Sequence, residues 1–249
     1  MTITLLQFSP VWGDPAACIR KAGAAIASAG RSDLYVLPEM WSTGFTMEPE
    51  THAEQEPGPA LSWMKATAAS TGAALAGSIA VRDGGQFRNR FYFVKPDGTV
   101  EYYDKHHLFT YSGEDRHYSA GNRKVIVEWK GVRFRLIVCY DLRFPGWCRN
   151  RGEYDVLLCV ASWPERRSDA WKLLLRARAV EDQCYVAGVN RAGDDPSCHY
   201  TGDSALIDAF GRTLVECRSG EECSCTADLD IDGLSAFRDS FPVLRDADE

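Results

Sequence analysis

Long apolar runs are missing from this sequence of 249 residues. No uninterrupted hydrophobic stretch approaches the roughly 20 residues that a helix needs to cross a bilayer. The first residues, Met1–Gln7, also lack the basic segment and the following apolar stretch of a secretory signal. We therefore expect a soluble protein that is not exported and has no membrane partner.

An excess of positive charge is also missing. The 35 acidic residues outnumber the 28 lysines and arginines, and the net charge is −7. Nucleic acids and anionic membranes bind basic surfaces, so neither is expected as a partner. A small anionic substrate is still allowed, because one or two local cations suffice to bind it.

The nine cysteines follow no disulfide framework, since their number is odd and their spacing is irregular. Several lie in apolar runs, where a reduced cysteine packs as a small hydrophobic residue. Together with the missing signal, this pattern predicts a reduced protein of the cytoplasm. Hydrophobic (45%) and charged (25%) residues occur in ordinary globular proportions, and no linker, low-complexity tract or repeat divides the chain. We therefore predict one domain that spans residues 1–249.

Motifs for metals, cofactors and serine nucleophiles are missing as well. His106 and His107 are adjacent, and adjacent residues rarely point at one ion; no spaced set of cysteines and histidines accompanies them. Cys223 and Cys225 form a C-x-C pattern, which fits the alternation of a strand better than a metal motif. No G-x-S-x-G sequence places a serine at a strand–helix turn. We expect neither a metal nor another cofactor.

Strand and helix patterns alternate along the chain. Asp14-Pro15 supplies a helix N-cap and a first-turn proline, and Pro96-Asp97-Gly98 predicts the turn of an antiparallel hairpin. We expect strands at residues 3–8, 34–37, 73–81, 91–94, 100–103, 125–128, 132–138, 156–160, 185–189, 205–207 and 213–216, and helices at 14–29, 59–70, 144–151 and 169–182. This doubled rhythm predicts an α/β fold in which two mixed sheets pack face to face with helices outside.

Three reactive side chains come just after predicted strands: Glu39, Lys105 and Cys139. The ends of strands in α/β folds meet at a shared crevice, where active sites collect. The chain turns immediately after Cys139, so the next backbone N–H can point at the group that the thiol attacks. A thiol is a weak nucleophile at neutral pH and needs either a cation that lowers its pKa, such as Lys105, or a base, such as Glu39.

Each of these residues also has an ordinary structural explanation. A cysteine in an apolar strand usually packs without reacting. A glutamate after a proline is usually a loop or helix-start acid, and a lysine is usually a solvated charge. The residue types alone therefore leave catalysis and packing open.

Three motifs in a fixed order favour catalysis. The segments Leu37–Met40 with Ser42–Phe45, Asp104–Phe109 and Val138–Pro145 resemble the glutamate, lysine and cysteine motifs of the nitrilase (carbon–nitrogen hydrolase) superfamily. One such motif is weak evidence, but three in the family's order are strong evidence, and the resemblance continues to Phe241-Pro242. On this basis the chain is identified as a member of that superfamily.

The resemblance implies a fold and a mechanism. Members fold as α-β-β-α sandwiches that associate into dimers. Cys139 would attack an amide carbon to form a thioester, while Lys105 and the backbone N–H of Tyr140 would hold the oxyanion. Glu39 would carry the proton from the thiol to ammonia and would then activate water. Glu114 resembles a second glutamate that orients the site, although a solvated loop acid would look the same in the sequence.

Three further segments look most like the omega-amidase branch of this superfamily. They are Ala161–Pro164, Ala177–Gln183 and Val189–Arg191. This branch is thought to hydrolyse the distal amide of 2-oxoglutaramate and 2-oxosuccinamate. Ser162 is one departure, because asparagine is expected there in close relatives.

Substrates of this kind carry a carboxylate beside the 2-oxo group, so the pocket is expected to contain a cation. Arg143 and Arg166 are the candidates for binding it, and Trp163 and Phe45 are expected as apolar walls. An equal alternative makes Arg143 a structural partner of Asp141 or of another acid.

Other functions of the same fold stay open at this point. Another amidase of the superfamily, acting on deaminated glutathione, an N-carbamoyl compound or a short aliphatic amide, would share the reactive residues and differ in its pocket. A nitrilase is less expected, because Tyr-Asp-Leu-Arg follows Cys139 where that branch has Trp-Glu. A catalytically silent binding scaffold would have no reason to keep all three reactive residue types.

Overall fold

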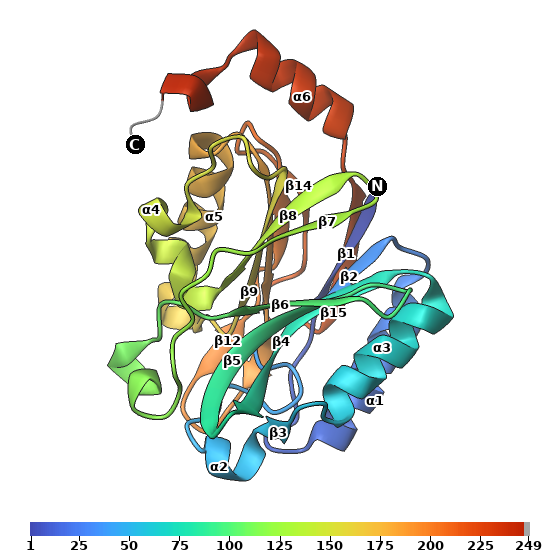
Figure 1. The fold of residues 1–249 in the computed structure, drawn as a ribbon, viewed down its shortest axis with the longest axis vertical. Coiled ribbons are helices and arrows are strands. Elements are labelled where there is room, and N and C mark those ends of the chain that lie inside the picture. The colour runs from blue at the N-terminus through green and yellow to red at the C-terminus, as the bar shows by residue number, and fades with distance from the viewer. Residues whose placement is uncertain (247–249) are drawn as a thin grey trace.

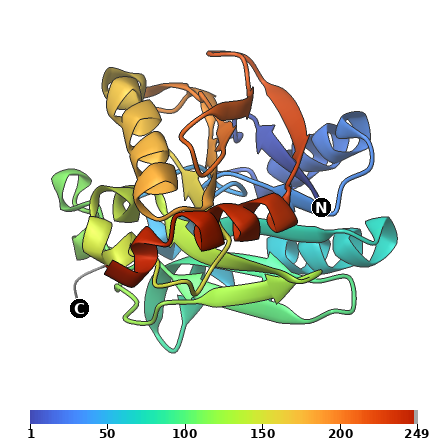
Figure 2. The ribbon, with the colours of Figure 1, turned by 90° about the horizontal axis from the view of Figure 1, so that it is seen from above.

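The protein is a four-layered α-β-β-α sandwich in a computed structural model that describes residues 1–246 (Figures 1 and 2). The last three residues of the predicted domain, 247–249, lie outside the described part. The predicted fold class is confirmed: two mixed sheets pack face to face, and helices cover their outer faces. Within residues 1–246 no helix is long and apolar enough to cross a membrane.

The first sheet has seven strands in the described part of the chain. They are β1 (Thr2–Gln7), β2 (Leu34–Val36), β3 (Glu54–Gln55), β4 (Ala74–Asp83), β5 (Gln86–Val94), β6 (Val100–Asp104) and β15 (Cys223–Asp228). Their order is β15-β1-β2-β4-β5-β6, with β3 beside β4. Strands β1, β2 and β4 are parallel, whereas β15 pairs antiparallel with β1 and brings distant parts of the chain together.

The second sheet has six strands among the described residues, in the order β14-β13-β10-β9-β8-β7. They are β7 (Ile126–Trp129), β8 (Val132–Val138), β9 (Val156–Ala161), β10 (Tyr185–Asn190), β13 (Ala205–Ile207) and β14 (Thr213–Glu216). The central strands β8, β9 and β10 are parallel. A separate short ribbon joins β11 (Ala192–Asp194) to β12 (His199–Thr201).

Helices α1 (Pro15–Ala29) and α3 (Pro59–Thr71) cover the first sheet, and α5 (Ser168–Glu181) covers the second (Figure 1). The Asp14 carboxylate caps α1 by accepting from the backbone N–H of Ala17, as its sequence predicts. Helix α3 ends at Gly72, whose φ of 69° is left-handed and favours glycine. The remaining helices are α2 (Pro49–His52), α4 (Pro145–Cys148) and α6 (Ile231–Ser240).

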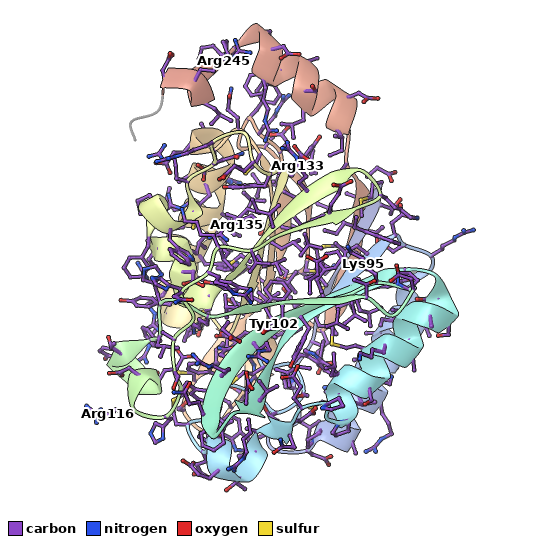
Figure 3. All side chains as sticks on the ribbon, in the orientation of Figure 1. Lys95, Tyr102, Arg116, Arg133, Arg135 and Arg245 are labelled. Carbon is purple, nitrogen blue, oxygen red and sulfur yellow. The ribbon has the colours of Figure 1, made fainter. Side chains whose placement is uncertain are left out.

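Apolar side chains fill three layers between these elements. Phe93 and Phe134, which come from opposite sheets, meet in the central layer with ring centroids 5.6 Å apart. Arg135 is a buried cation in strand β8, and its guanidinium donates to the backbone carbonyls of Val125 and Trp147 (Figure 3). The central layer is therefore apolar, and the charge of Arg135, which the alternation of β8 places on the other face of the sheet, is satisfied by hydrogen bonds.

Most predicted elements are present within a few residues, and the hairpin Ala205–Ile207 to Thr213–Glu216 has the predicted bounds. The predicted helix 144–151 is wrong in length, because only Pro145–Cys148 is helical. Buried Asn150 ends it: its backbone N–H and side-chain amide bind Asp182 and Tyr154 instead of continuing the helix. Elements β3, β11, β12, α2 and α6 were not predicted, because they are short or weakly patterned.

Candidate active site

The three reactive residues of the sequence meet at one end of the two sheets. Glu39 follows β2, Lys105 follows β6, and Cys139 follows β8, so the site joins both sheets. Glu39 and Lys105 are 0% and 1% exposed, which excludes the solvated alternatives for these two residues. Cys139 is partly exposed at the floor of a pocket.

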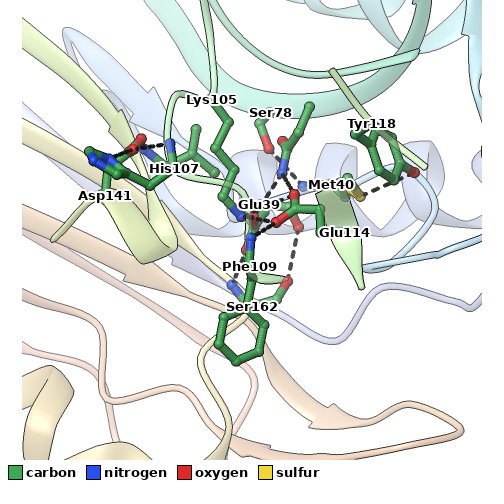
Figure 4. Close-up of polar contacts among 12 residues, drawn as sticks. Glu39, Met40, Ser78, Lys105, His107, Phe109, Glu114, Tyr118, Asp141 and Ser162 are labelled. Atoms are coloured by element: carbon green, nitrogen blue, oxygen red, sulfur yellow. Dashed lines mark hydrogen bonds and ion pairs between the residues drawn. The ribbon is translucent and has the colours of Figure 1, made fainter. Parts of the chain in front are cut away.

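Lys105 lies between two carboxylates (Figure 4). Its Nζ donates to Glu39 Oε1 over 2.8 Å and to Glu114 Oε2 and Oε1 over 2.9 and 3.1 Å. Glu114 is 0% exposed, so it is no solvated loop acid. Burial lowers the pKa of Lys105, but the charges of Glu114 and Glu39 reverse this effect, and the net pKa lies well above its ordinary value. The ammonium is therefore permanently charged at neutral pH.

Backbone and amide groups hold the two carboxylates in place. The Ser162 backbone N–H donates to Glu39 Oε2 over 2.7 Å, and the Phe109 N–H donates to Glu114 Oε2 over 2.6 Å. Because Ser162 contacts the carboxylate through its backbone, the departure from asparagine leaves this contact intact. Asn89, in strand β5, donates its side-chain amide to Glu39 over 2.8 Å and to Glu114 over 3.2 Å. No motif of the sequence points to Asn89.

Glu114 is the second carboxylate beside a single ammonium, that of Lys105, so the cluster has one negative charge in excess. Burial raises the pKa of Glu114, the ammonium of Lys105 lowers it, and nearby Glu39 raises it again; the net pKa lies above its usual range. Two carboxylates around one ammonium therefore favour holding an additional proton inside the cluster. Such a cluster can accept and return a proton during a reaction.

Cys139 occupies a strained position at the end of β8. Its φ is 46°, in the left-handed region that non-glycine residues rarely adopt, and a 3₁₀ turn, Cys139–Arg143, begins there. Burial raises the pKa of the thiol well above its ordinary value, and Glu39 adds to this, while Lys105 and the Ser162 N–H only partly oppose it. The thiol is therefore protonated at rest. Of the two activation routes predicted, the structure favours a base over a preformed thiolate.

Asp141 fixes the turn that carries Cys139. Its buried carboxylate accepts hydrogen bonds from Tyr103 Oη at 2.7 Å and from the Val138 backbone N–H at 3.0 Å. The His107 backbone N–H and the His107 Nδ1 atom each lie 2.8 Å from the same carboxylate (Figure 4). The alternative that paired Arg143 with Asp141 is wrong, because these four groups occupy the carboxylate.

The adjacent histidines have separate structural roles. His107 stacks on Phe144, with ring centroids 3.7 Å apart, and His106 stacks on Trp147 at the same distance. Across the residues that the structure describes, no three His, Cys, Asp or Glu side chains are grouped so that they could hold a metal ion.

A pocket of about 360 Å³ opens above Cys139. The predicted wall residues Phe45 and Trp163 line it, as do the predicted cations Arg143 and Arg166 and the residue Tyr140. The guanidinium of Arg143 lies 4.8 Å from the centroid of the Trp163 ring, and Arg143 forms no ion pair within residues 1–246. Arg166 is exposed, whereas Arg143 is half-buried.

Sequence reasoning missed several lining residues. Arg167 is a third cation, and its guanidinium lies 5.2 Å from the centroid of the Phe109 ring. Phe109 lies within the lysine motif and Arg167 beside Arg166, so their positions in the chain were the signal that could have found them. Met47, Tyr111 and Cys198 also line the pocket.

This architecture occurs in known proteins. It is similar to XC1258 of Xanthomonas campestris, described as a CN-hydrolase superfamily protein with an arsenic adduct in the active site (TM-score 0.97, 44% identity, 100% of this chain and 97% of that one). It is also similar to Saccharomyces cerevisiae Nit3, a member of branch 10 of the nitrilase superfamily (TM-score 0.90, 25% identity, covering 98% and 94%). The fold is therefore that of the nitrilase superfamily.

The sequence comparisons agree with the fold. Residues 2–239 match the pattern of the carbon–nitrogen hydrolase family. The chain is 44% identical to the omega-amidase YafV of Escherichia coli K12, covering 100% of this chain and 97% of that protein. It is 38% identical to the 2-oxoglutaramate amidase of Bacillus subtilis, covering 98% and 96%. The chain belongs to the carbon–nitrogen hydrolase family, as its three motifs predict.

Proposed function

We propose that this protein is an omega-amidase, which hydrolyses the distal amide of 2-oxo dicarboxylic acid monoamides such as 2-oxoglutaramate. The observation that carries the proposal is the position of Cys139. It lines a pocket that also holds the unpaired, half-buried Arg143, and the charges of Glu39, Lys105 and Glu114 act on its thiol. The similarity to the omega-amidase YafV and to a 2-oxoglutaramate amidase supports the same conclusion.

The first half of the reaction forms a thioester. Glu39 takes the thiol proton of Cys139 as the sulfur attacks the amide carbon. Negative charge then develops on the amide oxygen, where the Lys105 ammonium and the Tyr140 backbone N–H stabilise it. The C–N bond breaks, and the leaving nitrogen departs as ammonia with the proton that Glu39 returns.

The second half releases the acid. Glu39 takes a proton from a water molecule, whose oxygen attacks the thioester carbon, and the same two donors hold the oxyanion. The C–S bond breaks, the sulfur recovers its proton, and the 2-oxo dicarboxylic acid leaves. Glu114 keeps Lys105 and Glu39 in place throughout, through its bonds to Lys105 and to Asn89.

Arg143 supplies the substrate selectivity in this proposal. Its guanidinium is fixed against the Trp163 ring and has no acidic partner within the described residues. A planar guanidinium binds a carboxylate through two parallel hydrogen bonds. The carboxylate of a 2-oxo acid amide would pair with Arg143 while its distal amide reaches Cys139. Arg166 lies more exposed and is the weaker candidate.

Ammonia release from 2-oxoglutaramate tests the proposal, measured beside glutamine, asparagine and a neutral short-chain amide. We expect strong preference for 2-oxoglutaramate, and loss of turnover in Cys139→Ala with an unchanged circular dichroism spectrum. Activity confined to another amide would retain the mechanism and refute the omega-amidase assignment. Ammonia from none of these amides would favour the binding scaffold.

We further propose that the protein is a cytoplasmic homodimer. Leu173 and Val180 on α5 are 68% and 53% exposed, and Phe210 beside them is 53% exposed, which is a large apolar area for a free surface. All nine cysteines are free thiols, which supports a reducing compartment. Light scattering of the purified protein measures the mass, and a monomer would refute the dimer.

A further inference from the structure

Three cysteines outside the active site meet where the edges of the two sheets approach each other. Cys217 directly follows β14, the edge strand of the second sheet. Cys223 and Cys225 belong to β15, the edge strand of the first sheet. The proposed amidase mechanism uses none of these thiols.

Cys217 and Cys225 are in close contact. Their Sγ atoms lie 3.2 Å apart, and the two residues are 3% and 9% exposed in the central apolar layer. Cys223 is more accessible, and its backbone carbonyl lies 4.0 Å from the Cys217 sulfur.

We propose that Cys217 and Cys225 are a site of reversible disulfide formation that cross-links the edge strands of the two sheets. A disulfide needs Sγ atoms about 2.05 Å apart, so the sulfurs need to approach by about 1 Å, which small side-chain rotations supply. The backbone on both sides is already held: the Cys217 N–H donates to the Ser204 carbonyl, and Cys225 pairs with Leu5 of β1.

A hydroperoxide is the oxidant that this step requires. One thiolate sulfur attacks a peroxide oxygen, the O–O bond breaks, and hydrogen peroxide yields a sulfenic acid and hydroxide. The second sulfur then attacks the sulfenic sulfur and displaces its hydroxyl group. The two sulfurs lose two electrons, and the two thiol protons leave in two molecules of water. A small thiol reductant reverses the bond by thiol–disulfide exchange.

The environment of Cys217 slows its reaction with an oxidant. The hydrogen bond with Cys225, together with burial, raises the pKa of Cys217, and burial raises the pKa of Cys223 to about 11. Because the thiolate is the reactive form, Cys217 and Cys223 react slowly at neutral pH. The site therefore responds to sustained oxidation and not to brief exposure.

Peptide mapping of the folded, full-length protein tests the proposal. The protein is treated with hydrogen peroxide, quenched with catalase, alkylated with N-ethylmaleimide in denaturant and digested with trypsin. Cys217 then lies in peptide 213–218, while Cys223 and Cys225 lie in peptide 219–238. We expect the two peptides to be linked, two hydrogens lighter than their sum, with fragmentation at Ser224 that places the bond on Cys225.

Two results would overturn the proposal. One is a bond from Cys217 to Cys223, and the other is complete alkylation of Cys217 after prolonged treatment with a large excess of peroxide. Variants give an independent check: Cys223→Ser should keep the cross-link, and Cys217→Ser should abolish it. If Cys217→Ser does not fold, peptide mapping of the protein without substitutions still shows which two cysteines are linked.

Thermal unfolding gives a second readout. Oxidised protein should melt about 5 °C above the reduced protein, because a cross-link between strands restricts the unfolded chain. Dithiothreitol should reverse the shift, and Cys217→Ser should not show it. The same shift in Cys217→Ser would place the effect at another thiol and would contradict the proposal.

Discussion

At the scale of single residues, the charged groups of the proposed active site differ in whether they have partners of opposite charge. Lys105 has two carboxylate partners, and Asp141 has four donors, so both are fixed. The arginines of the pocket are the exception, since Arg143, Arg166 and Arg167 all line it without an acidic partner in the described chain. A cation that lacks a partner inside a pocket favours an anionic group on the substrate.

Arg143→Gln should raise the KM for 2-oxoglutaramate about 10- to 100-fold, because a charge-assisted bond to the substrate carboxylate is lost. Steady-state kinetics with a neutral short-chain amide as second substrate checks this, and its KM should change little. Arg166→Gln is the matched control and should have a smaller effect. Equal losses on both substrates would show that Arg143 supports the fold and not the carboxylate.

At the scale of elements, the first turn of helix α3 contacts a buried acid, Glu54. Glu54 in β3 is 7% exposed, and both of its carboxylate oxygens accept from the Ala60 backbone N–H, at 3.0 and 3.2 Å. Burial raises the pKa of Glu54 from 4.5 to about 7, although the N–H groups of Ala60 and Leu61 lower it in part. The folded state therefore binds this proton more tightly than the unfolded chain does.

This shift predicts a pH-dependent stability. Between pH 4.5 and about 7 the folded protein holds more protons at Glu54 than the unfolded chain, so the free energy of unfolding falls as pH rises. The contribution is on the order of 3 kcal/mol. Glu54→Gln should flatten the dependence of the melting temperature on pH in this window, whereas Glu50→Gln, at an exposed position, should not. If the melting temperature of Glu54→Gln varied with pH as that of the unsubstituted protein does, Glu54 would not be the group responsible.

At the scale of the whole molecule, the active site depends on how the two sheets are joined. The lysine segment comes from the first sheet and the cysteine turn from the second, and the Asp141 carboxylate binds both through His107 and Val138. The Ser162 N–H, which follows β9, reaches Glu39 of the first sheet in the same way. Sheet packing and catalytic geometry are therefore set by the same contacts.

Asp141→Asn should weaken both stability and turnover. The amide of asparagine directs N–H groups at donors that now bind a carboxylate, which costs on the order of 3 kcal/mol. The melting temperature should fall by about 6 to 12 °C, and kcat should fall with it. Asp115→Asn, at an exposed position, is the control. An unchanged melting temperature with normal kcat would remove Asp141 from this role.

Most of the elements and the reactive residues follow from local patterns along the chain. The Ala205–Ile207 to Thr213–Glu216 hairpin was found because its turn chemistry is local. Glu39, Lys105 and Cys139 were found because each lies next to a strand end within a short motif. Signals of this kind depend on neighbouring residues, so they can be seen before the chain is folded.

The groups that surround those residues come from distant parts of the chain, so they follow from the folded arrangement of the sheets. Asn89 meets Glu39 across 50 positions of sequence, and Ser162 meets it across 123. Glu114, which could have been a solvated loop acid, is a buried partner of Lys105. Cys217 lies beside Cys225. Contacts between distant segments depend on how sheets pack and which strands become edges, and no local pattern specifies that packing.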